Sequence, residues 1–382
     1  MPVVPLVRRI PKALGVVVTV AVLAGCFADR LYRGLQPTPI PNEPPPAGLA
    51  SLSAQSCQPC HAEITEEWAG SGMAAAYTDP VFQAKWKHED NFYYCLSCHA
   101  PLEAQQPTRV TGLAKIAPLT AIESPNPLFS HSLQREGVTC VACHLKDGAM
   151  VGPHEVNAPH PVRVDPEFGE AKTCERCHQM PKIPFTRSDR PLSDTHAEWA
   201  EWKAVTGRTE TCTDCHMPAV ERQSALGGPV RESRRHTFPG AWDDDFVRSA
   251  LDVSEPTLTD GGVELTLTNR AGHRLPSGEP GRALLVNASF RDASGEELAS
   301  VEQRIERRVK MPSGRDLGDN TLLPGETRTV SFEAVLPEPV AEVVITIIFD
   351  RLANIPSAHD LNLKNRSFEL AYRRVSAAQV VH

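Results

Sequence analysis

The stretch Cys57-Gln-Pro-Cys60-His61 decides how this chain of 382 residues is built, because the same pattern occurs four more times. Each copy has two cysteines three positions apart and a histidine directly after the second cysteine. The copies begin at residues 57, 95, 140, 174 and 212, so successive copies are 34 to 45 residues apart. They contain ten of the eleven cysteines, namely Cys57, Cys60, Cys95, Cys98, Cys140, Cys143, Cys174, Cys177, Cys212 and Cys215. Their histidines are His61, His99, His144, His178 and His216.

The Cys-x-x-Cys-His pattern is typical of covalent c-type haem attachment. Two thiols one helical turn apart reach the two vinyl groups on one porphyrin edge, and the following histidine can then bind the iron as proximal ligand. Zinc knuckles and disulfides also use paired cysteines, but neither requires a histidine directly after each pair. The sequence therefore predicts five haem c groups, held by the ten cysteines and five histidines.

The spacing of the copies leaves little protein around each predicted haem. All five copies lie in a module that we place at residues 51–247. With so few residues per cofactor, the haems themselves must form much of the core and lie edge to edge or stacked. This crowding predicts a conduit for electrons.

The N-terminus has the features of an export signal. Arg8, Arg9 and Lys12 precede an apolar run from Ala13 to Ala24, which is too short to span a membrane comfortably. The run ends in Leu-Ala-Gly-Cys26, which resembles the lipobox of bacterial lipoproteins. We therefore expect a signal peptide at residues 1–25 and a lipid anchor on Cys26. The alternative is an uncleaved anchor helix with an incidental cysteine.

Both interpretations place the remaining chain outside the cytoplasm, in the cell envelope, as a periplasmic or outer-membrane-associated protein. Residues 26–50 are rich in proline and predict a semi-rigid linker that holds the folded body away from a membrane. The net charge of −8 argues against a nucleic-acid partner.

The pattern changes after about residue 247, where the cysteines stop. Residues 263–268 and 329–335 alternate apolar and polar side chains, and residues 283–290 and 343–349 are rich in β-branched residues. Glycine-containing turns separate these segments. We therefore expect an α+β multidomain protein: a mostly α-helical or irregular haem module, followed at residues 248–382 by an immunoglobulin-like antiparallel β-sandwich.

Several segments between the motifs resemble elements of cytochrome c554-like multihaem proteins. They are Trp68-Ala-Gly-Ser-Gly-Met73, Glu136-Gly-Val-Thr before Cys140, Glu198-Trp199 before Thr211 to Pro218, Arg235-His-Thr-Phe-Pro-Gly240 and Ala271-Gly-His-Arg-Leu-Pro-Ser-Gly278. The resemblance covers roughly residues 55 to 380 and is specific for haem ligation rather than for a substrate.

The resemblance implies distal iron ligands in three of these segments. His236 and His273 stand where the family has ligating histidines, and His273 would reach across the domain boundary. Met73 stands where the family has a histidine, so this sequence departs from the pattern. A methionine ligand would raise the reduction potential of that haem, whereas a methionine packed in a helix core is the alternative.

Two further histidines are candidates from their context. His131 lies just before the third motif, and either His154 or His160 in the following Pro-rich loop is expected to be a ligand, with His160 favoured. His88 lies among charged residues and is expected at the surface.

Five closely spaced irons suit electron transfer between redox partner proteins, whose identities the sequence does not indicate. The rival hypothesis is an oxidoreductase that acts on a small nitrogen or sulfur compound at a five-coordinate haem. No Cys-x-x-Cys-Lys motif is present and no catalytic residue can be assigned, so a carrier is favoured over an enzyme. A structural subunit of a membrane complex is a third possibility.

Overall fold

The computed structural model describes residues 39–41, 43–116, 119–180, 188, 190–259, 262–310, 314–333, 340–355, 361–363 and 365–376. The predicted signal peptide, Cys26 and the first part of the predicted linker lie outside these residues. Within the described ranges, no helix is both long enough and apolar enough to cross a membrane.

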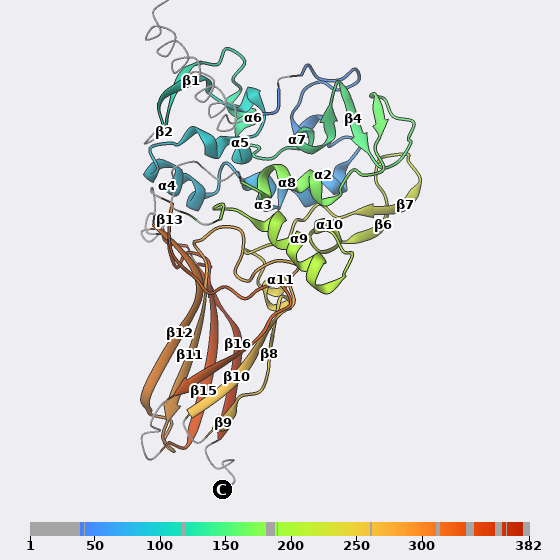
Figure 1. Ribbon diagram of the computed structural model, residues 1–382. Helices are drawn as coiled ribbons and strands as arrows, with labels where there is room; N and C mark the ends of the chain where they lie inside the picture. The colour runs from blue at the N-terminus through green and yellow to red at the C-terminus, as the bar shows by residue number, and fades with distance from the viewer. Residues whose placement is uncertain are drawn as a thin grey trace, which may run out of the picture.

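The first part of the chain consists of short helices joined by irregular segments, drawn from blue to yellow in Figure 1. The α-helices are α2 (Ala62–Ala69), α3 (Gly72–Ala75), α4 (Pro80–His88), α5 (Leu96–His99), α6 (His131–Gln134), α7 (Cys140–His144), α8 (Ala171–His178), α9 (Thr195–Thr206), α10 (Cys212–His216) and α11 (Asp244–Ser249). Three 3₁₀ turns accompany them: η1 (Ala54–Ser56), η2 (Tyr93–Cys95) and η3 (Glu103–Gln105).

Four of the five motifs form the end of a helix. Helices α5, α7, α8 and α10 each end at the histidine of a motif, whereas the first motif lies just before α2. Helix α10 begins with a capping box, in which the Thr211 backbone N–H donates to Asp214 at 2.8 Å. Within the helical turn, the two cysteine side chains of a motif project toward the same side. The following histidine side chain can point toward a different side.

Three small sheets also belong to this part, which the prediction of a mostly helical or irregular module did not include. They are the hairpin β1 (Thr108–Ile116) and β2 (Leu119–Pro125), the sheet β3 (Leu145–Lys146), β4 (Ala149–Gly152) and β5 (Val162–Val164), and the hairpin β6 (Ala219–Gln223) and β7 (Val230–Arg234).

The described part of the predicted linker, residues 39–41 and 43–50, contacts the helical part. Ile40 forms a bridge with Leu102, in which its N–H donates to the Pro101 carbonyl at 2.7 Å. The Glu43 carboxylate accepts backbone N–H groups of Asp147 and Gly148. Backbone pairing and a carboxylate anchor hold this segment in place despite its prolines.

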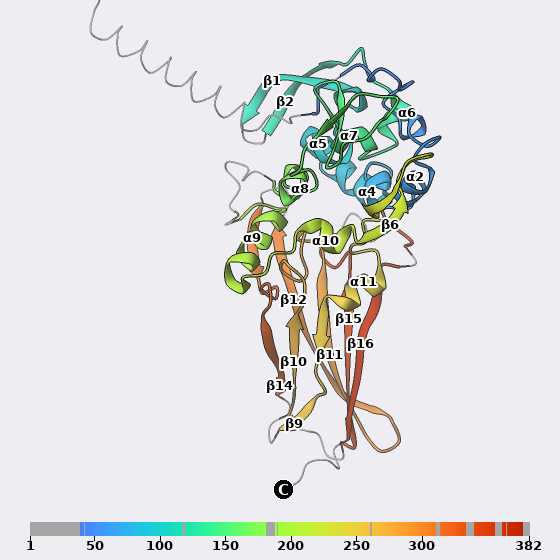
Figure 2. The same ribbon diagram turned by 90° about the vertical axis from the view of Figure 1, so that its right-hand side faces the viewer.

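The rest of the chain forms two antiparallel sheets of long strands, visible in the lower half of Figures 1 and 2. One sheet has the order β13-β12-β11-β15-β16, and the other has the order β14-β10-β8 with β9 also paired to β10. The strands are β8 (Leu251–Val253), β9 (Thr257–Thr259), β10 (Gly262–Asn269), β11 (Ala283–Arg291), β12 (Glu297–Lys310), β13 (Arg315–Asp319), β14 (Thr327–Glu333), β15 (Glu342–Asp350) and β16 (Ser367–Ser376).

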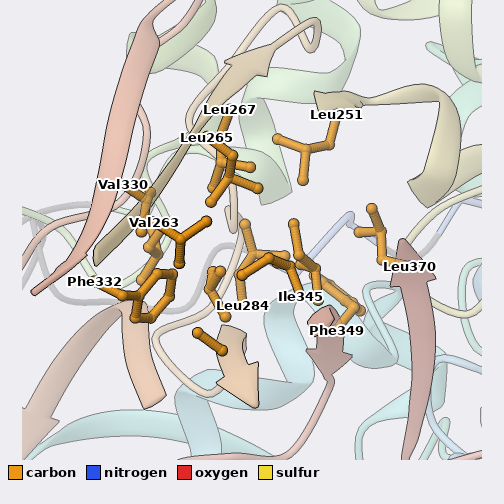
Figure 3. Packing of buried hydrophobic residues seen from close by; sticks show 14 of the residues in the cluster. Leu251, Val263, Leu265, Leu267, Leu284, Val330, Phe332, Ile345, Phe349 and Leu370 are labelled. Atoms are coloured by element: carbon orange, nitrogen blue, oxygen red, sulfur yellow. The ribbon is translucent and has the colours of Figure 1, made fainter. Parts of the chain in front are cut away.

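One hydrophobic core lies between these two sheets, as Figure 3 shows. Val263, Leu265 and Leu267 of β10 face residues such as Leu284 and Ile345 of the other sheet. Alternate residues of β10 and β14 point inward, which is the periodicity predicted for residues 263–268 and 329–335. The α+β multidomain prediction is confirmed, and the predicted boundary at 247/248 falls inside α11.

The first prediction concerns this core. Phe290 is 0% exposed, so replacing it with alanine should destabilise the strand part by about 3–5 kcal/mol through lost burial and a residual cavity. Native-state hydrogen exchange of the β11 and β15 amides measures the loss. Leu298→Ala is the control, because Leu298 is 38% exposed and its replacement should cost less than about 0.5 kcal/mol. Equal effects of the two substitutions would contradict the assignment of the core.

Candidate haem centres

The five motifs lie side by side, although they are far apart in sequence. Side-chain contacts join Cys57 of the first motif to Cys140 of the third, and Cys98 of the second to Cys177 of the fourth. A third contact joins Cys174 of the fourth motif to Cys212 of the fifth. Since the cysteines would carry the attachment edge of each predicted haem, haems bound at these motifs would have neighbouring edges close together.

The fourth motif is the branch point of this arrangement. It contacts the second and fifth motifs directly, and Cys143 of the third motif interacts electrostatically with Cys174 and Cys177. The spatial order is therefore first, third, fourth, with the second and fifth both joined to the fourth. Nothing in the spacing of the copies along the sequence indicated this order.

One carboxylate explains why the first and third motifs meet. Glu136, just before the third motif, accepts hydrogen bonds from the Ser53 hydroxyl at 2.5 Å and the Ala54 backbone N–H at 2.9 Å. It also accepts from the Thr139 hydroxyl at 3.0 Å. These bonds fasten the segment that leads into the first motif to the segment that leads into the third.

Four of the motif histidines are oriented in the same way. In each, the ring Nδ1 lies within hydrogen-bonding distance of a backbone carbonyl, which can only accept, so Nδ1 carries the proton. The pairs are His61 with Ser224 at 2.8 Å, His99 with Ala76 at 2.6 Å, His144 with Val151 at 2.9 Å and His216 with Pro239 at 2.7 Å. This tautomer leaves the lone pair of Nε2 free to bind a metal.

The small sheets supply two of these carbonyls. Val151 belongs to β4, and Ser224 lies at the tip of the β6–β7 hairpin, where the Leu226 N–H also donates to the Cys60 carbonyl at 2.8 Å. The sheets that the sequence did not predict therefore position ligands.

Burial favours the neutral form of four motif imidazoles, those of His99, His144, His178 and His216. Burial lowers the pKa of His216 to about 4, and electrostatic repulsion from His273 and His178 acts in the same direction. Burial likewise lowers the pKa of His99, His144 and His178. Neutral imidazole is the form that binds iron.

Two motif histidines face a second imidazole at the separation that one iron requires. The ring centroids of His144 and His236 are 6.3 Å apart with 25° between the planes. Those of His216 and His273 are 6.4 Å apart with 20° between the planes. Two imidazoles that bind one iron through Nε2, with Fe–N distances of about 2 Å, have ring centroids about 6 Å apart. The donor sets thus fit six-coordinate haem, with the porphyrin supplying the other four nitrogens.

A single loop, residues 235–240, serves both pairs. It carries His236, whose Nδ1 donates to the Arg234 carbonyl at 3.0 Å, and burial lowers the pKa of His236 to about 4. Three residues later, the Pro239 carbonyl of the same loop accepts the hydrogen bond from His216. The haem centres of the third and fifth motifs therefore share a structural support.

His273 lies in the loop between β10 and β11 and reaches the helical part from the strand part. Asn269 holds this loop, because its side-chain amide donates to the His273 carbonyl at 2.8 Å. The ring of Trp202 packs against Gly272, 3.4 Å from the position that a Cβ there would occupy. Trp202 therefore supports the loop that carries His273.

Met73 lies in α3, beside the chain that enters the third motif. Its carbonyl accepts the Val138 N–H at 2.9 Å, and the Trp68 indole N–H donates to the Val138 carbonyl at 2.8 Å. Gly137 has a φ of 59°, and a Cβ there would lie 2.7 Å from the Met73 carbonyl oxygen. The segments around Trp68 and Gly137, which both resemble elements of the cytochrome c554-like proteins, therefore form a close backbone contact with each other.

The other candidate ligands are less closely tied to a motif. His131 is exposed at the start of α6, and its ring packs edge-on against Phe129 at 6.5 Å. The His160 ring lies 3.4 Å from the Pro161 carbonyl, and its backbone packs against Gly48. Ligation by Met73, His131, His160, His236 and His273 stays a prediction.

The architecture is similar to that of a solved structure described as a penta-haem cytochrome c552 from Thermochromatium tepidum. The TM-score is 0.66 at 19% sequence identity, and the match covers 87% of this chain and 100% of that chain. The chain therefore has the fold of a multihaem cytochrome. No protein-family model and no curated protein sequence matches the chain.

The paired imidazoles generate the second prediction. Replacing His236 with alanine should remove one axial ligand and convert one low-spin haem to a high-spin one in electron paramagnetic resonance, and His273→Gly should do the same for a different haem. His88→Ala is the control, since His88 is exposed at the end of α4. An unchanged spectrum of either ligand variant would exclude that histidine as a ligand.

Proposed function

We propose that this protein is a five-haem c-type cytochrome that transfers electrons between partner proteins in the bacterial cell envelope. The observation that carries the proposal is the contact between cysteines of different motifs, at Cys57–Cys140, Cys98–Cys177 and Cys174–Cys212. Attachment at these positions brings the edges of the cofactors together with almost no protein between them. The multihaem fold supports the same interpretation.

Bound haem would supply the one-electron chemistry, and the chain's own residues set the conditions for it. The two cysteines of each motif would hold one porphyrin, and four of the five motif histidines would present Nε2 from a defined tautomer. His236 and His273 provide second ligands, with Met73, His131 and His160 proposed for the remaining irons. Axial ligand, burial and nearby charge then decide each reduction potential.

The branch at the fourth motif generates the third prediction. A double variant, Cys174→Ala with Cys177→Ala, should retain four haems by mass spectrometry but interrupt the connection between the second motif and the fifth. Reduction by a soluble donor, followed by stopped-flow absorbance, should become slow and multiphasic. The control is Cys57→Ala with Cys60→Ala, which removes a terminal haem and leaves the others connected. If both variants equilibrate equally fast, the proposed route is wrong.

The alternative function is turnover of a small nitrogen or sulfur compound at a five-coordinate haem. Among the described residues, a second imidazole lies opposite His144 and another opposite His216. An open distal position would therefore belong to the haem of one of the other three motifs. A carrier should show no high-spin haem and no binding of carbon monoxide, whereas one high-spin haem that binds carbon monoxide would favour the enzyme.

We further propose that residues 51–247 form the haem domain, and that the two sheets after it form an immunoglobulin-like sandwich at 248–382. The shared core between the sheets supports the sandwich. The lipid anchor on Cys26 and the export signal at 1–25 rest on the sequence pattern.

The fourth prediction concerns the anchor. Cys26→Ser should release the protein from membranes into the soluble envelope fraction, because the serine cannot receive the lipid. Fractionation followed by haem staining measures the shift. Retention in the membrane fraction would instead favour the uncleaved anchor helix.

A further inference from the structure

Two carboxylates contact the segments that carry His236 and His273, and neither contact uses the imidazole. Glu67 of α2 accepts the backbone N–H of His236 itself, at 2.8 Å. Glu198 of α9 accepts the backbone N–H of Arg274, next to His273, at 3.2 Å, and the Ser277 hydroxyl at 2.5 Å. The Glu67 side chain is 9% exposed and that of Glu198 is 4% exposed.

Both carboxylates come from helices close in sequence to a motif. Helix α2 directly follows His61, and α9 lies shortly before Cys212. The loops that they hold come from other places: residues 235–240 follow the β6–β7 hairpin, and residues 269–278 belong to the strand part. Each carboxylate therefore ties a distal-ligand loop to the frame that carries the haem motifs.

The charges around the two carboxylates differ. Glu67 has two arginine partners, Arg222 and Arg235, each at 2.9 Å. Glu198 has one, Arg190, which also pairs with Asp194 at 3.2 Å and Asp319 at 3.0 Å. Since Arg190 is shared among three carboxylates, the negative charge of Glu198 is less fully compensated.

We propose that Glu67 and Glu198 are positioning residues, each of which fixes one distal histidine through its loop backbone and lowers the reduction potential of the haem that this histidine binds. A bond to a backbone N–H restrains the loop whichever rotamer the imidazole adopts, so the ligand stays in place in both oxidation states. A buried negative charge near the iron favours the ferric state, and the effect is larger at Glu198. The inference rests on the haem ligation proposed above.

The chain offers a matched control for each residue. Glu63, in α2, pairs with the same Arg222 at 3.2 Å, but its side chain is 58% exposed. Glu201, in α9, pairs with the Arg274 side chain at 3.7 Å and is 47% exposed. Each control removes the same charge from the same helix without touching the backbone of a ligand loop.

The experiment compares Glu198→Gln, Glu198→Ala and Glu201→Gln in the intact holoprotein, and in parallel Glu67→Gln, Glu67→Ala and Glu63→Gln. Redox titration and electron paramagnetic resonance are the readouts, and the affected haem is identified from the His236→Ala and His273→Gly spectra. The glutamine variants keep an acceptor oxygen, so the haem should stay low-spin, while its midpoint potential rises by about 59 mV, which is a tenfold change in a one-electron equilibrium. The shift should be larger for Glu198→Gln than for Glu67→Gln.

The alanine variants lose the acceptor as well, and one haem should become partly high-spin. Glu63→Gln and Glu201→Gln should leave spin states unchanged and potentials nearly so. The inference is overturned if Glu198→Gln and Glu67→Gln shift no potential more than their controls do, or if the alanine variants stay fully low-spin. Mass spectrometry of the unmodified protein and of each variant distinguishes failure of this inference from failure of the proposed function. If the proposed function is wrong, the unmodified protein already carries fewer than five haems.

Discussion

The hydrogen bond between a motif histidine and a backbone carbonyl is the interaction on which the rest of the structure depends. A haem that is attached only through cysteines could still tilt, and its proximal imidazole could present either nitrogen. Carbonyls at Ala76, Val151, Ser224 and Pro239 remove that freedom. They come from a helix end, a short strand, a hairpin tip and a loop, which accounts for much of the irregular backbone in the helical part.

Those features that repeat or alternate in the sequence could be predicted. The five motifs indicated the cofactor, and alternation located β10 and β14, while β-branched runs located β11 and β15. Strand β12 (Glu297–Lys310) was not predicted, because charged residues such as Glu302 and Arg308 obscure its period. A strand with one face exposed to solvent tolerates charged side chains. Backbone pairing with β11, rather than a hydrophobic pattern, determines where β12 lies in the sheet.

The candidate site could be predicted only where a local pattern surrounds a residue. His236 and His273 stood in recognisable segments, and the structure places each opposite a motif histidine. Which motif each one faces depends on chain topology, which spacing does not encode. The supporting roles of Glu136 and Trp202 depend on partners more than 50 residues away, Ala54 for Glu136 and Gly272 for Trp202, and no local signal reveals such pairs.

The origin of His273 in the strand part has a consequence for biogenesis. The chain is synthesised from its N-terminus, so His216 emerges well before the loop that carries its partner. Until β10 and β11 have paired with their neighbours and presented that loop, a haem attached at the fifth motif would have no imidazole from residue 273. Completion of the proposed haem centre at the fifth motif would therefore wait until the strand part has folded.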